Sequence, residues 1–434
     1  MITRTETTKS GFFIPRKPLL DRRIIQFSWG LLLSVILPGT IVYLIWPEEL
    51  LNAEGLRNSV VASFVAFVGG LLWYRRLVRY PGVQGLENVL TVFIATFALA
   101  AATLPMARLD YNRTFLFSSF LFTLTGFAVI AARQGLNAHP HFQIVPYGST
   151  DRLLQISRAK WTIMTQANLP EGGPAGIVVD LRADLPDAWQ RMIADAVLVG
   201  IPVFHMKQIE EALSGRVDIE HMSENQFGLL APSPEYRNLK TVIDFVVSVL
   251  LLPLLIMPFL LIAAAIKLDS RGPIFFKQPR VGHRGRVFEV YKFRTMHDTQ
   301  LSPDGDDARS DAMTKAGDAR ITRIGRTLRR YRIDEVSQII NVLKGEMSWI
   351  GPRPEAVPLS EWYASELPFY QYRHILKPGI TGWAQVNQGH VTDLDDAHDK
   401  LRFDFYYIKY FSTWIDLLIV IRTCRILISG FGAK

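Results

Sequence analysis

Cysteine is almost absent from this sequence of 434 residues. Cys424 is the only one, so an internal disulfide is impossible and a zinc site built from clustered cysteines is excluded. Charged residues are also scarce, at 20% of the chain, and the stretch 24–47 has none. Residues 1–23 are polar and basic and contain no apolar core, so we expect no cleavable signal peptide.

Apolar residues are abundant where charge is missing. They make up 49% of the chain, and the mean hydropathy is +0.15, which is typical of a membrane protein when the apolar residues are gathered in runs. A helix needs roughly 20 residues to cross a bilayer. Four runs are candidates, and the second is the shortest of them: Phe27–Trp46, Ser59–Trp73, Val89–Ala107 and Thr114–Ala132.

Positively charged residues indicate how these four runs are oriented. Arg22 and Arg23 precede the first run, and Arg75 and Arg76 lie between the second and the third, whereas the two other loops are poorer in cations. The positive-inside rule therefore predicts a four-span bundle, residues 1–135, with both ends in the cytoplasm. Anionic lipid and phosphate-bearing substrates then explain the net charge of +8 better than nucleic acid does.

Residues 141–231 have the pattern of a small α/β domain. Short apolar stretches that read as strands alternate with helical segments: Phe142–Pro146, Gly176–Val179 and Ile201–Phe204 for the strands, Ala188–Val199 and Lys207–Leu213 for the helices. Such alternation predicts a parallel sheet. The first strand leads into Tyr147–Thr150, where a dinucleotide-binding fold would have Gly-x-Gly-x-x-Gly. We therefore predict a degenerate Rossmann-like domain that binds no dinucleotide.

A fifth apolar run, Val242–Ile266, differs from the other four. Pro253 and Pro258 lie inside it, Asp244 lies near its start, and cations flank it on both sides. A proline interrupts the hydrogen-bond ladder of a helix, and a true span normally has its cations mainly on one side. We therefore favour a re-entrant helix-break-helix hairpin over residues 241–267 that enters and leaves the membrane on the cytoplasmic face. A kinked fifth span is the alternative.

The sequence RRYRIDEVSQIINVLKGEMSWIGPRP, residues 329–354, concentrates the chemistry of the chain. The adjacent carboxylates Asp334 and Glu335 follow a run of arginines and precede the rigid corner Pro352–Pro354. Acidic residues at this place can simply begin a helix. Alternatively, the carboxylates, a helix N-terminus and the arginines hold Mg²⁺ and phosphate together, with one carboxylate as nucleophile and the other as metal ligand.

Cations also accompany two predicted strands, Ile274–Lys277 and Val287–Phe293, around a glycine-rich turn. Alternation along the second strand places Lys292 and Arg294 on one face and aromatic residues on the other. Beside a membrane such cations can bind lipid head groups. The alternative is a phosphate site, in which the Arg294 guanidinium binds two oxygens at once.

Five sequence blocks, in this order, resemble the bacterial sugar transferase family, whose members are monotopic phosphoglycosyl transferases: IKLDSRGPIFFKQPRVG, YKFRTM, ARITRIGRTLRRYRIDE, NVLKGEMSWIGPRPE and LKPGITGWAQVN. The resemblance covers residues 237–434, and the upstream parts resemble the large undecaprenyl-phosphate glucose or galactose phosphotransferase type. The implied fold is a membrane protein with a four-helix transmembrane bundle, a degenerate Rossmann-like cytosolic domain and an α/β catalytic domain anchored by the re-entrant helix.

The resemblance implies a two-step reaction. Asp334, which matches the aspartate of the family's Asp-Glu dyad, attacks the sugar-bearing phosphate of a UDP-sugar and releases UMP. Undecaprenyl phosphate then takes the sugar phosphate from the aspartate. Glu335 is implied as a ligand of Mg²⁺. The resemblance also implies that the product begins an exopolysaccharide, capsule or O-antigen repeat unit at the bacterial inner membrane, with the catalytic domain on the cytoplasmic face.

Further site residues come from the same blocks. Four cations match positions that bind phosphate or shape the family's site: Lys292, Arg294, Arg329 and Arg353. Gln385 lies in a glycine-rich turn after Pro378-Gly379; it either contacts the nucleobase or sugar or serves only to build the turn. One departure is Ser337, where the family usually has proline. Because the dyad is intact, we expect catalysis to survive this difference.

Two other functions compete with this interpretation. A glycosyltransferase that releases UDP would use a DxD motif, and Asp304-Gly-Asp306 has that spelling within the acidic stretch 297–318, which we predict to be a surface loop or a lid. A membrane sensor or assembly subunit would carry a vestigial catalytic domain, against which the intact dyad argues. The sequence does not reveal the donor sugar, and it leaves a homodimer open.

Overall fold

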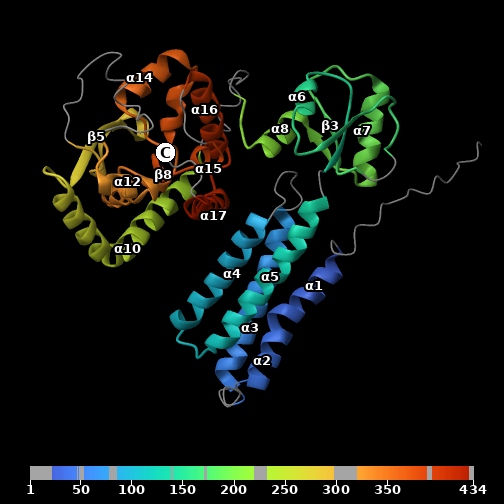
Figure 1. Ribbon diagram of the computed structural model, residues 1–434. Coiled ribbons are helices and arrows are strands. Elements are labelled where there is room, and N and C mark those ends of the chain that lie inside the picture. Colours follow the sequence, from blue (N-terminus) through green and yellow to red (C-terminus); the bar gives the residue numbers. More distant parts are fainter. Residues whose placement is uncertain are drawn as a thin grey trace, which may run out of the picture. The chain divides into compact units, whose positions relative to one another are not determined.

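The computed structural model describes residues 22–45, 47, 53–77, 86–137, 140–170, 174–218, 232–297, 320–388 and 393–429. The chain forms two compact units, Met1–Ser214 and Gly215–Lys434 (Figure 1). The first contains four long apolar helices and the predicted α/β domain, and the second contains a fifth apolar helix and the dyad. Residues 215–218 belong to the second unit, and the bounds 141–231 of the α/β domain stay a prediction.

Four rods of helix form a bundle in the first unit. One rod is continuous through α1 (Arg23–Leu31), the π-helical segment η2 (Leu32–Ile36) and α2 (Leu37–Ile45), and the others are α3 (Ala53–Leu77), α4 (Leu86–Met106) and α5 (Arg113–Asn137). Each rod is long and apolar enough to cross a membrane. Helix α3 extends well beyond the short run from which it was predicted. Large apolar side chains stay exposed on the outside, among them Leu72, Leu99 and Phe117.

Aromatic side chains fill the interior of this bundle. Phe67, Phe93 and Phe127 are fully buried, and the ring centroids of Phe93 and Phe127 lie 4.8 Å apart. Gly30 lets the first rod approach α3 closely, since a Cβ at this position would lie 2.0 Å from the Phe67 ring. The bundle is thus packed inside and apolar outside, as expected for helices surrounded by lipid. The chain is a membrane protein.

The α/β domain is a parallel sheet with the strand order β2-β1-β3-β4, as predicted. Its strands are β1 (His141–Ile144), β2 (Lys160–Ile163), β3 (Gly176–Val179) and β4 (Val203–His205), and its helices are α6 (Asp151–Leu154), α7 (Asp187–Val199) and α8 (Met206–Ser214). The sequence-based prediction missed β2. That strand lies at the edge of the sheet and is mostly exposed, so its sequence has no apolar run of the kind that marks a buried parallel strand.

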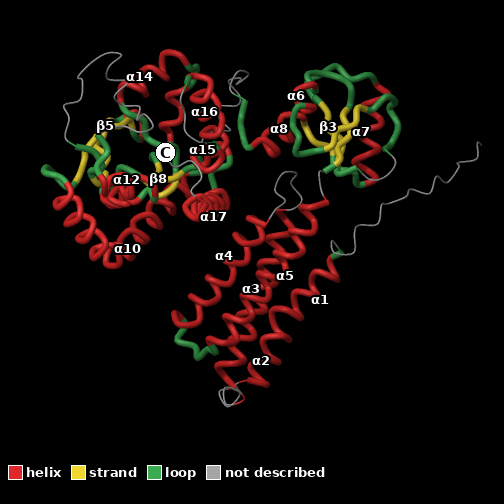
Figure 2. The backbone as a smooth tube through the Cα atoms, viewed as in Figure 1, coloured by secondary structure: helices red, strands yellow, loops and turns green. Residues whose placement is uncertain are grey.

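The second unit combines helices with two small sheets (Figure 2). β5 (Phe275–Val281) and β6 (Val287–Phe293) form the predicted antiparallel hairpin around η5 (His283–Gly285), and β7 (Ser348–Ile350) pairs in parallel with β8 (Gly379–Thr381). The helices are α10 (Pro234–Asp269), α12 (Arg323–Arg330), η6 (Ile333–Gln338), α13 (Ile339–Leu343), α14 (Val357–Glu366), η7 (Tyr370–Ile375), α15 (Trp383–Asn387), α16 (Leu394–Lys409) and α17 (Thr413–Ser429). The main core lies among α14, α16 and α17, around Phe405 and Tyr407.

Helix α10 is continuous through Pro253 and Pro258, so the predicted break into two helices is wrong. Figure 1 shows α10 instead as two arms that meet at a bend. A proline inside a helix removes one backbone hydrogen bond and bends the axis without ending the helix when the neighbouring residues favour it. A straight helix of 36 residues would extend about 54 Å, and the bend avoids that length.

Both arms of α10 contact the rest of the second unit. Ser248, in the first arm, accepts a hydrogen bond from Trp349 Nε1 at 3.0 Å, and Ile266, in the second arm, packs against Phe293. Exposed apolar side chains gather between these two contacts: Leu250, Leu254, Ile256, Met257, Leu260 and Leu261. An apolar stretch whose two ends return to one body agrees with a re-entrant helix. The passage of α10 into a membrane stays a prediction.

A buried carboxylate ties the first arm of α10 to α17. Asp416 accepts hydrogen bonds from Lys240 Nζ at 2.7 Å, from the Tyr236 hydroxyl at 2.6 Å and from the Tyr407 hydroxyl at 2.6 Å. Lys240 Nζ also lies 3.9 Å from a carboxylate oxygen of Asp244. Asp244, the charged residue near the start of the apolar run, is therefore paired with Lys240, as a buried charge requires.

Replacing Asp416 by alanine should loosen the attachment of α10. The change leaves a buried ammonium group and two hydroxyl groups without their shared acceptor, which should cost on the order of 3 kcal/mol of unfolding free energy. Thermal unfolding in detergent measures the loss. Asp395→Asn, at an exposed position in α16, is the matched control. A loss no larger than that of the control would show that α10 is held by its other contacts.

Candidate active site

A cavity of about 770 Å³ lies beside the dyad in the second unit. Charged side chains line one part of it, from the hairpin, η6, the residues around the Pro352–Pro354 corner and α16: Arg280, Lys292, Arg332, Glu335, Arg353, Glu355 and Lys400. Apolar side chains from α10 and α17 line another: Ile243, Val247, Leu251, Leu417, Val420 and Leu427. The cavity therefore suits a ligand, or a pair of ligands, with both charged and apolar parts.

Asp334 and Glu335 lie in the first turn of η6, a 3₁₀ helix of six residues that α13 follows directly, so the pair does begin a helical segment, as one of the two interpretations expected. The preceding Arg332 has a left-handed backbone, with φ of 52°, which is uncommon for a residue with a side chain. This conformation turns the chain from α12 into the dyad. Because so short a helix has only a small dipole, the positive potential at the dyad comes from cationic side chains.

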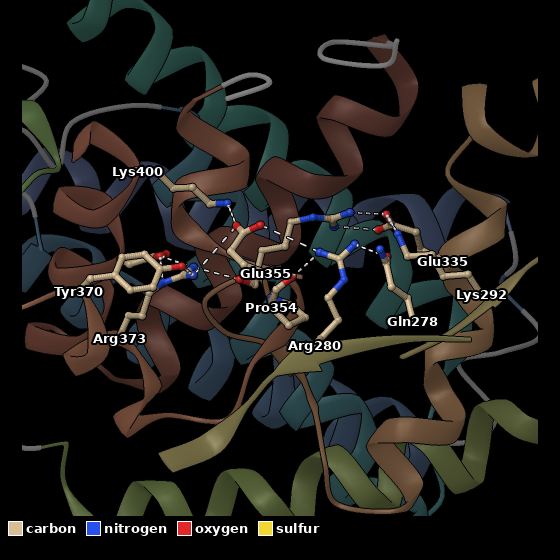
Figure 3. Close-up of polar contacts among 11 residues, drawn as sticks. Gln278, Arg280, Lys292, Glu335, Pro354, Glu355, Tyr370, Arg373 and Lys400 are labelled. Atoms are coloured by element: carbon tan, nitrogen blue, oxygen red, sulfur yellow. Dashed lines mark hydrogen bonds and ion pairs between the residues drawn. The ribbon is translucent and has the colours of Figure 1, made fainter. Parts of the chain in front are cut away.

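Glu335 is buried and is held by two cations. Arg353 Nη2 donates to Oε1 at 2.6 Å and Arg353 Nη1 to Oε2 at 3.1 Å, while Lys292 Nζ donates to Oε1 at 3.2 Å (Figure 3). Burial alone would raise the pKa of this carboxyl, but the charges of Arg353 and Lys292 outweigh it and hold the pKa well below its usual value of 4.5. Glu335 is thus an ionised group with both oxygens engaged.

Asp334 has a different environment from its neighbour. It is half-buried, and burial raises the pKa of its carboxyl; Lys292 opposes this shift, and the negative charge of Glu335 adds to it. Weaker opposing contributions come from Arg329 and Arg353. A carboxylate that has lost part of its hydration beside cations has the environment of an activated nucleophile.

Hydrogen bonds between β6 and the chain after the dyad bring Lys292 into place. Ser337 Oγ donates to Tyr291 O at 3.0 Å, Tyr291 N donates to Asn341 Oδ1 at 3.0 Å, and Asn341 Nδ2 donates to Glu289 O at 2.7 Å. Ser337 and Asn341 are fully buried, so water does not compete for these bonds. The serine that replaces the family's usual proline therefore holds β6 through a hydroxyl that proline lacks.

Arg294 and Arg329, predicted to bind phosphate, are not among the residues that line the cavity. Arg294 is buried, and its Nη2 donates to Ser270 O at 2.7 Å and to Ser270 Oγ at 2.8 Å, which ties β6 to the end of α10. Gly272 leaves room for it, because a Cβ there would lie 2.1 Å from Arg294 Nη1. Arg329 Nε donates to Thr295 Oγ1 at 2.9 Å. Both arginines thus have structural contacts, and phosphate binding by them stays a prediction.

Gln385, Glu355 and Lys400 are further polar residues of the cavity lining. Gln385 lines the cavity, and its Nε2 donates to Ile380 O at 3.0 Å, so it belongs to a structural turn and also faces the site. Sequence reasoning missed Glu355 and Lys400, which form an ion pair in the lining. The available signal for Glu355 was its place directly after the Pro352–Pro354 corner. Lys400 lies in α16, and no motif in the sequence marked it.

Mg²⁺ was predicted at the dyad. Among the residues that the structure describes, no group of three or more histidine, cysteine, aspartate or glutamate side chains could hold a metal ion. The dyad offers two carboxylates, and both oxygens of the Glu335 carboxylate already accept hydrogen bonds from cations. This donor set fits Mg²⁺ only as an ion shared with a ligand, because Mg²⁺ commonly takes one or two carboxylates together with substrate phosphates and water.

Comparisons with known proteins agree with each other. The model of the family described as bacterial sugar transferase matches residues 235–430. A UDP-N-acetylgalactosamine-undecaprenyl-phosphate N-acetylgalactosaminephosphotransferase of Aeromonas hydrophila is 40% identical over 385 residues, which cover 87% of this chain and 88% of that protein. Two UDP-glucose:undecaprenyl-phosphate glucose-1-phosphate transferases are 43% identical over shorter stretches. The one from Caulobacter vibrioides matches 45% of this chain and 71% of that protein, and the one from Escherichia coli matches 43% and 39%.

Acid should destabilise the second unit partly through Glu335. The folded state holds the pKa of this carboxyl below its usual value of 4.5, so its stabilising contribution is complete above that pH and is lost as the pH falls through the lower, folded-state pKa. Glu335→Gln should therefore lower stability at neutral pH and flatten its decline in acid. Unfolding free energies measured between neutral pH and about pH 3 test this; curves of equal slope for the two proteins would contradict it.

Proposed function

This chain belongs to the bacterial sugar transferase family, and we propose that it transfers a sugar phosphate from a UDP-sugar to undecaprenyl phosphate. The chain is a transferase, as its relatives are. The observation that carries the proposal is the lining of the cavity. Glu335 and its cations line the same cavity as apolar side chains of the membrane-type helix α10 and of α17. That combination suits a reaction between a charged donor and a lipid acceptor.

The first step uses Asp334 as the nucleophile. One of its carboxylate oxygens attacks the phosphorus that carries the sugar, the bond from this phosphorus to the bridging oxygen breaks, and UMP leaves with the electron pair of that bond. An acyl phosphate then joins the sugar phosphate to Asp334. The different environments of the dyad support this assignment, since both oxygens of Glu335 are engaged by cations, whereas Asp334 is partly desolvated beside them.

The second step returns the enzyme to its starting form. An oxygen of undecaprenyl phosphate attacks the same phosphorus, the acyl phosphate bond breaks, and Asp334 leaves as a carboxylate. The products of the two steps are UMP and undecaprenyl diphosphate-sugar, so every atom of the two substrates is retained. Lys292 and Arg353 stand beside the dyad and supply positive charge as negative charge gathers on the transferred phosphate.

The acceptor's lipid chain fits the apolar part of the lining. Val247 and Leu251 on α10 and Val420 and Leu427 on α17 line the cavity, and α10 keeps most of its apolar side chains exposed. A lipid that lies along these helices brings its phosphate toward the charged residues. We propose that α10 is re-entrant and that the catalytic unit lies on the cytoplasmic face of the bacterial inner membrane, where nucleotide sugars are made.

Mg²⁺ belongs to the proposal as a cofactor. Glu335 is the residue that would hold it together with the donor's diphosphate. When bound, the ion would withdraw negative charge from the phosphate oxygens. Glu335 can offer only those lone pairs that Arg353 and Lys292 leave, so its contribution is limited by the ion pairs already described.

No feature of the described residues favours the two competing functions. The Asp304-Gly-Asp306 motif, on which a UDP-releasing glycosyltransferase would depend, lies outside the described residues, as does nearly all of the predicted loop at 297–318. A sensor without activity would not need the ion pairs that hold Glu335. The relatives' names include both N-acetylgalactosamine and glucose, so an assay must identify the donor. The proposed product would begin a polysaccharide repeat unit.

Asp334→Asn should abolish both UMP release and lipid product, because an amide cannot replace the carboxylate as nucleophile. We expect a loss of at least about 10³-fold in kcat/KM. Purified protein in detergent with Mg²⁺ and undecaprenyl phosphate is offered a panel of UDP-sugars, and the released nucleotide is identified. Asp395→Asn is the control at an exposed site. UDP instead of UMP would indicate an ordinary glycosyltransferase, and full activity of Asp334→Asn would remove it as nucleophile.

Cys424 allows a test of where the lipid lies. It is the only cysteine of the chain, it is exposed, and it lines the cavity from α17. Undecaprenyl phosphate should slow its labelling by a maleimide several-fold, and a UDP-sugar alone should not. Cys424→Ser, which removes the reactive group with little change in size, should stay active and unlabelled. Labelling that ignores the lipid would place its chain elsewhere.

A further inference from the structure

We propose that Glu355 is a positioning residue that aims Arg353 at the dyad, by holding two arginines that bind the backbone of the Pro352–Pro354 corner. Glu355 is buried and lies in the cavity lining. Glu355 has no part in the proposed two-step reaction. The proposal concerns how the site is held together, and it rests on the proposed function only for its activity measurements.

Three cations surround the Glu355 carboxylate (Figure 3). Lys400 Nζ donates to Oε1, Arg373 Nη1 lies 4.0 Å from Oε1, and Arg280 Nη1 lies 4.0 Å from Oε2. These cations come from α16, η7 and β5, so one carboxylate joins three separate elements. Burial alone would raise the pKa of Glu355, but the charges of Lys400, Arg373 and Arg280 lower it to about 2, so the group is ionised at any pH at which the protein works.

Two of these cations bind the backbone of the corner. Arg373 Nη2 donates to Arg353 O at 2.9 Å, and Arg280 Nη1 donates to Pro354 O at 3.0 Å. Backbone groups bind the carbonyls on either side, because Gly379 N donates to Pro352 O at 3.0 Å and Val281 N donates to Glu355 O at 3.0 Å. The backbone carbonyls of four consecutive residues therefore each accept a hydrogen bond: Pro352, Arg353, Pro354 and Glu355.

The two arginines depend on Glu355 to different degrees. Arg373 has a second carboxylate partner, Asp404, whose Oδ2 accepts from Nε at 2.9 Å and from Nη2 at 2.7 Å. Arg280 has one other side-chain partner, the amide oxygen of Gln278 at 2.7 Å. Without the Glu355 charge, Arg280 would be left as a buried cation beside Arg353, and Lys400 as a buried cation beside Arg373. Their repulsion would push the corner apart.

The position of the corner decides where the Arg353 guanidinium lies. Prolines on both sides of Arg353 restrict the backbone of the corner, so a displacement of the corner also displaces the Arg353 side chain. Its two bonds to Glu335, at 2.6 and 3.1 Å, depend on that placement. A displacement of about 1 Å in a group that positions the reacting atoms can cost roughly 10²-fold in rate. Glu355 would thus influence the reaction without touching a substrate.

The test compares Glu355→Gln with Glu361→Gln, which changes an exposed glutamate of α14. We expect Glu355→Gln to lower kcat for UMP release roughly 10²-fold, with a much smaller change in KM for the UDP-sugar, and Glu361→Gln to change neither. Glu355→Asp should recover part of the rate, because it restores the charge at a slightly greater distance. Unaltered kinetics of Glu355→Gln would overturn the proposal.

Thermal unfolding separates positioning from a general loss of structure. If Glu355 only aims Arg353, Glu355→Gln should stay folded at the assay temperature while its kcat falls, and Glu355→Asp should recover part of the rate. A loss of rate that appears only where the variant is unfolded would contradict the proposal.

A second variant and a structure keep the proposal testable if Glu355→Gln fails to fold. Arg280→Lys keeps the charge but cannot bind Gln278, Glu355 and Pro354 O together, and it should lower kcat about 10-fold. A structure of either variant should show the Arg353–Glu335 contact lengthened. That measurement needs no activity. If the wild type releases no UMP from any donor, the proposed function fails while the contact can still be tested.

Discussion

The buried charge of Glu335 is the constraint on which the rest of the catalytic unit depends. A buried carboxylate is tolerated only when its partners are held firmly in place, and here the partners come from two distant parts of the chain. Lys292 arrives on β6, which is bound to the buried Ser337 and Asn341. Arg353 arrives on a corner whose carbonyls are all bound. The two scaffolds meet at a single carboxylate and leave Asp334 beside it.

Helix α10 connects this site with an exposed apolar surface. Its first arm is held by Asp416 and by Trp349, and its second arm ends at Ser270, which accepts two hydrogen bonds from Arg294. Side chains of the first arm line the cavity together with those of α17. The same helix that exposes an apolar surface therefore forms a wall of the site. A cavity with both charged and apolar walls suits an enzyme that joins a charged donor to a lipid, because each substrate then keeps surroundings that match its own polarity.

Sequence patterns predicted the helices and strands better than they predicted the side-chain contacts. The period of apolar residues located the four long helices and the hairpin, since both patterns are local. It missed β2, an exposed edge strand, because burial is the source of the apolar signal. Alternation placed Arg294 on the same face as Lys292, as a phosphate site would require. It could not show that the guanidinium is buried against Ser270. Glu355 and Lys400 were missed because an ion pair between distant residues leaves no periodic trace.

The sequence by itself determined that the chain has four long apolar helices before a parallel α/β domain, a fifth apolar run after it, and an intact Asp-Glu dyad among arginines, because composition, period and motif are properties of neighbouring residues. The tertiary structure alone decided which cations serve the dyad. Lys292 is 43 residues and Arg353 is 18 residues from Glu335 in the chain. Arg329 is only a few residues away, but its Nε donates to Thr295, and it acts on Asp334 less strongly than Lys292 does. Packing selects among several cations of equal charge, because the energy of a buried ion pair depends on distance and solvent exclusion and not on separation along the chain.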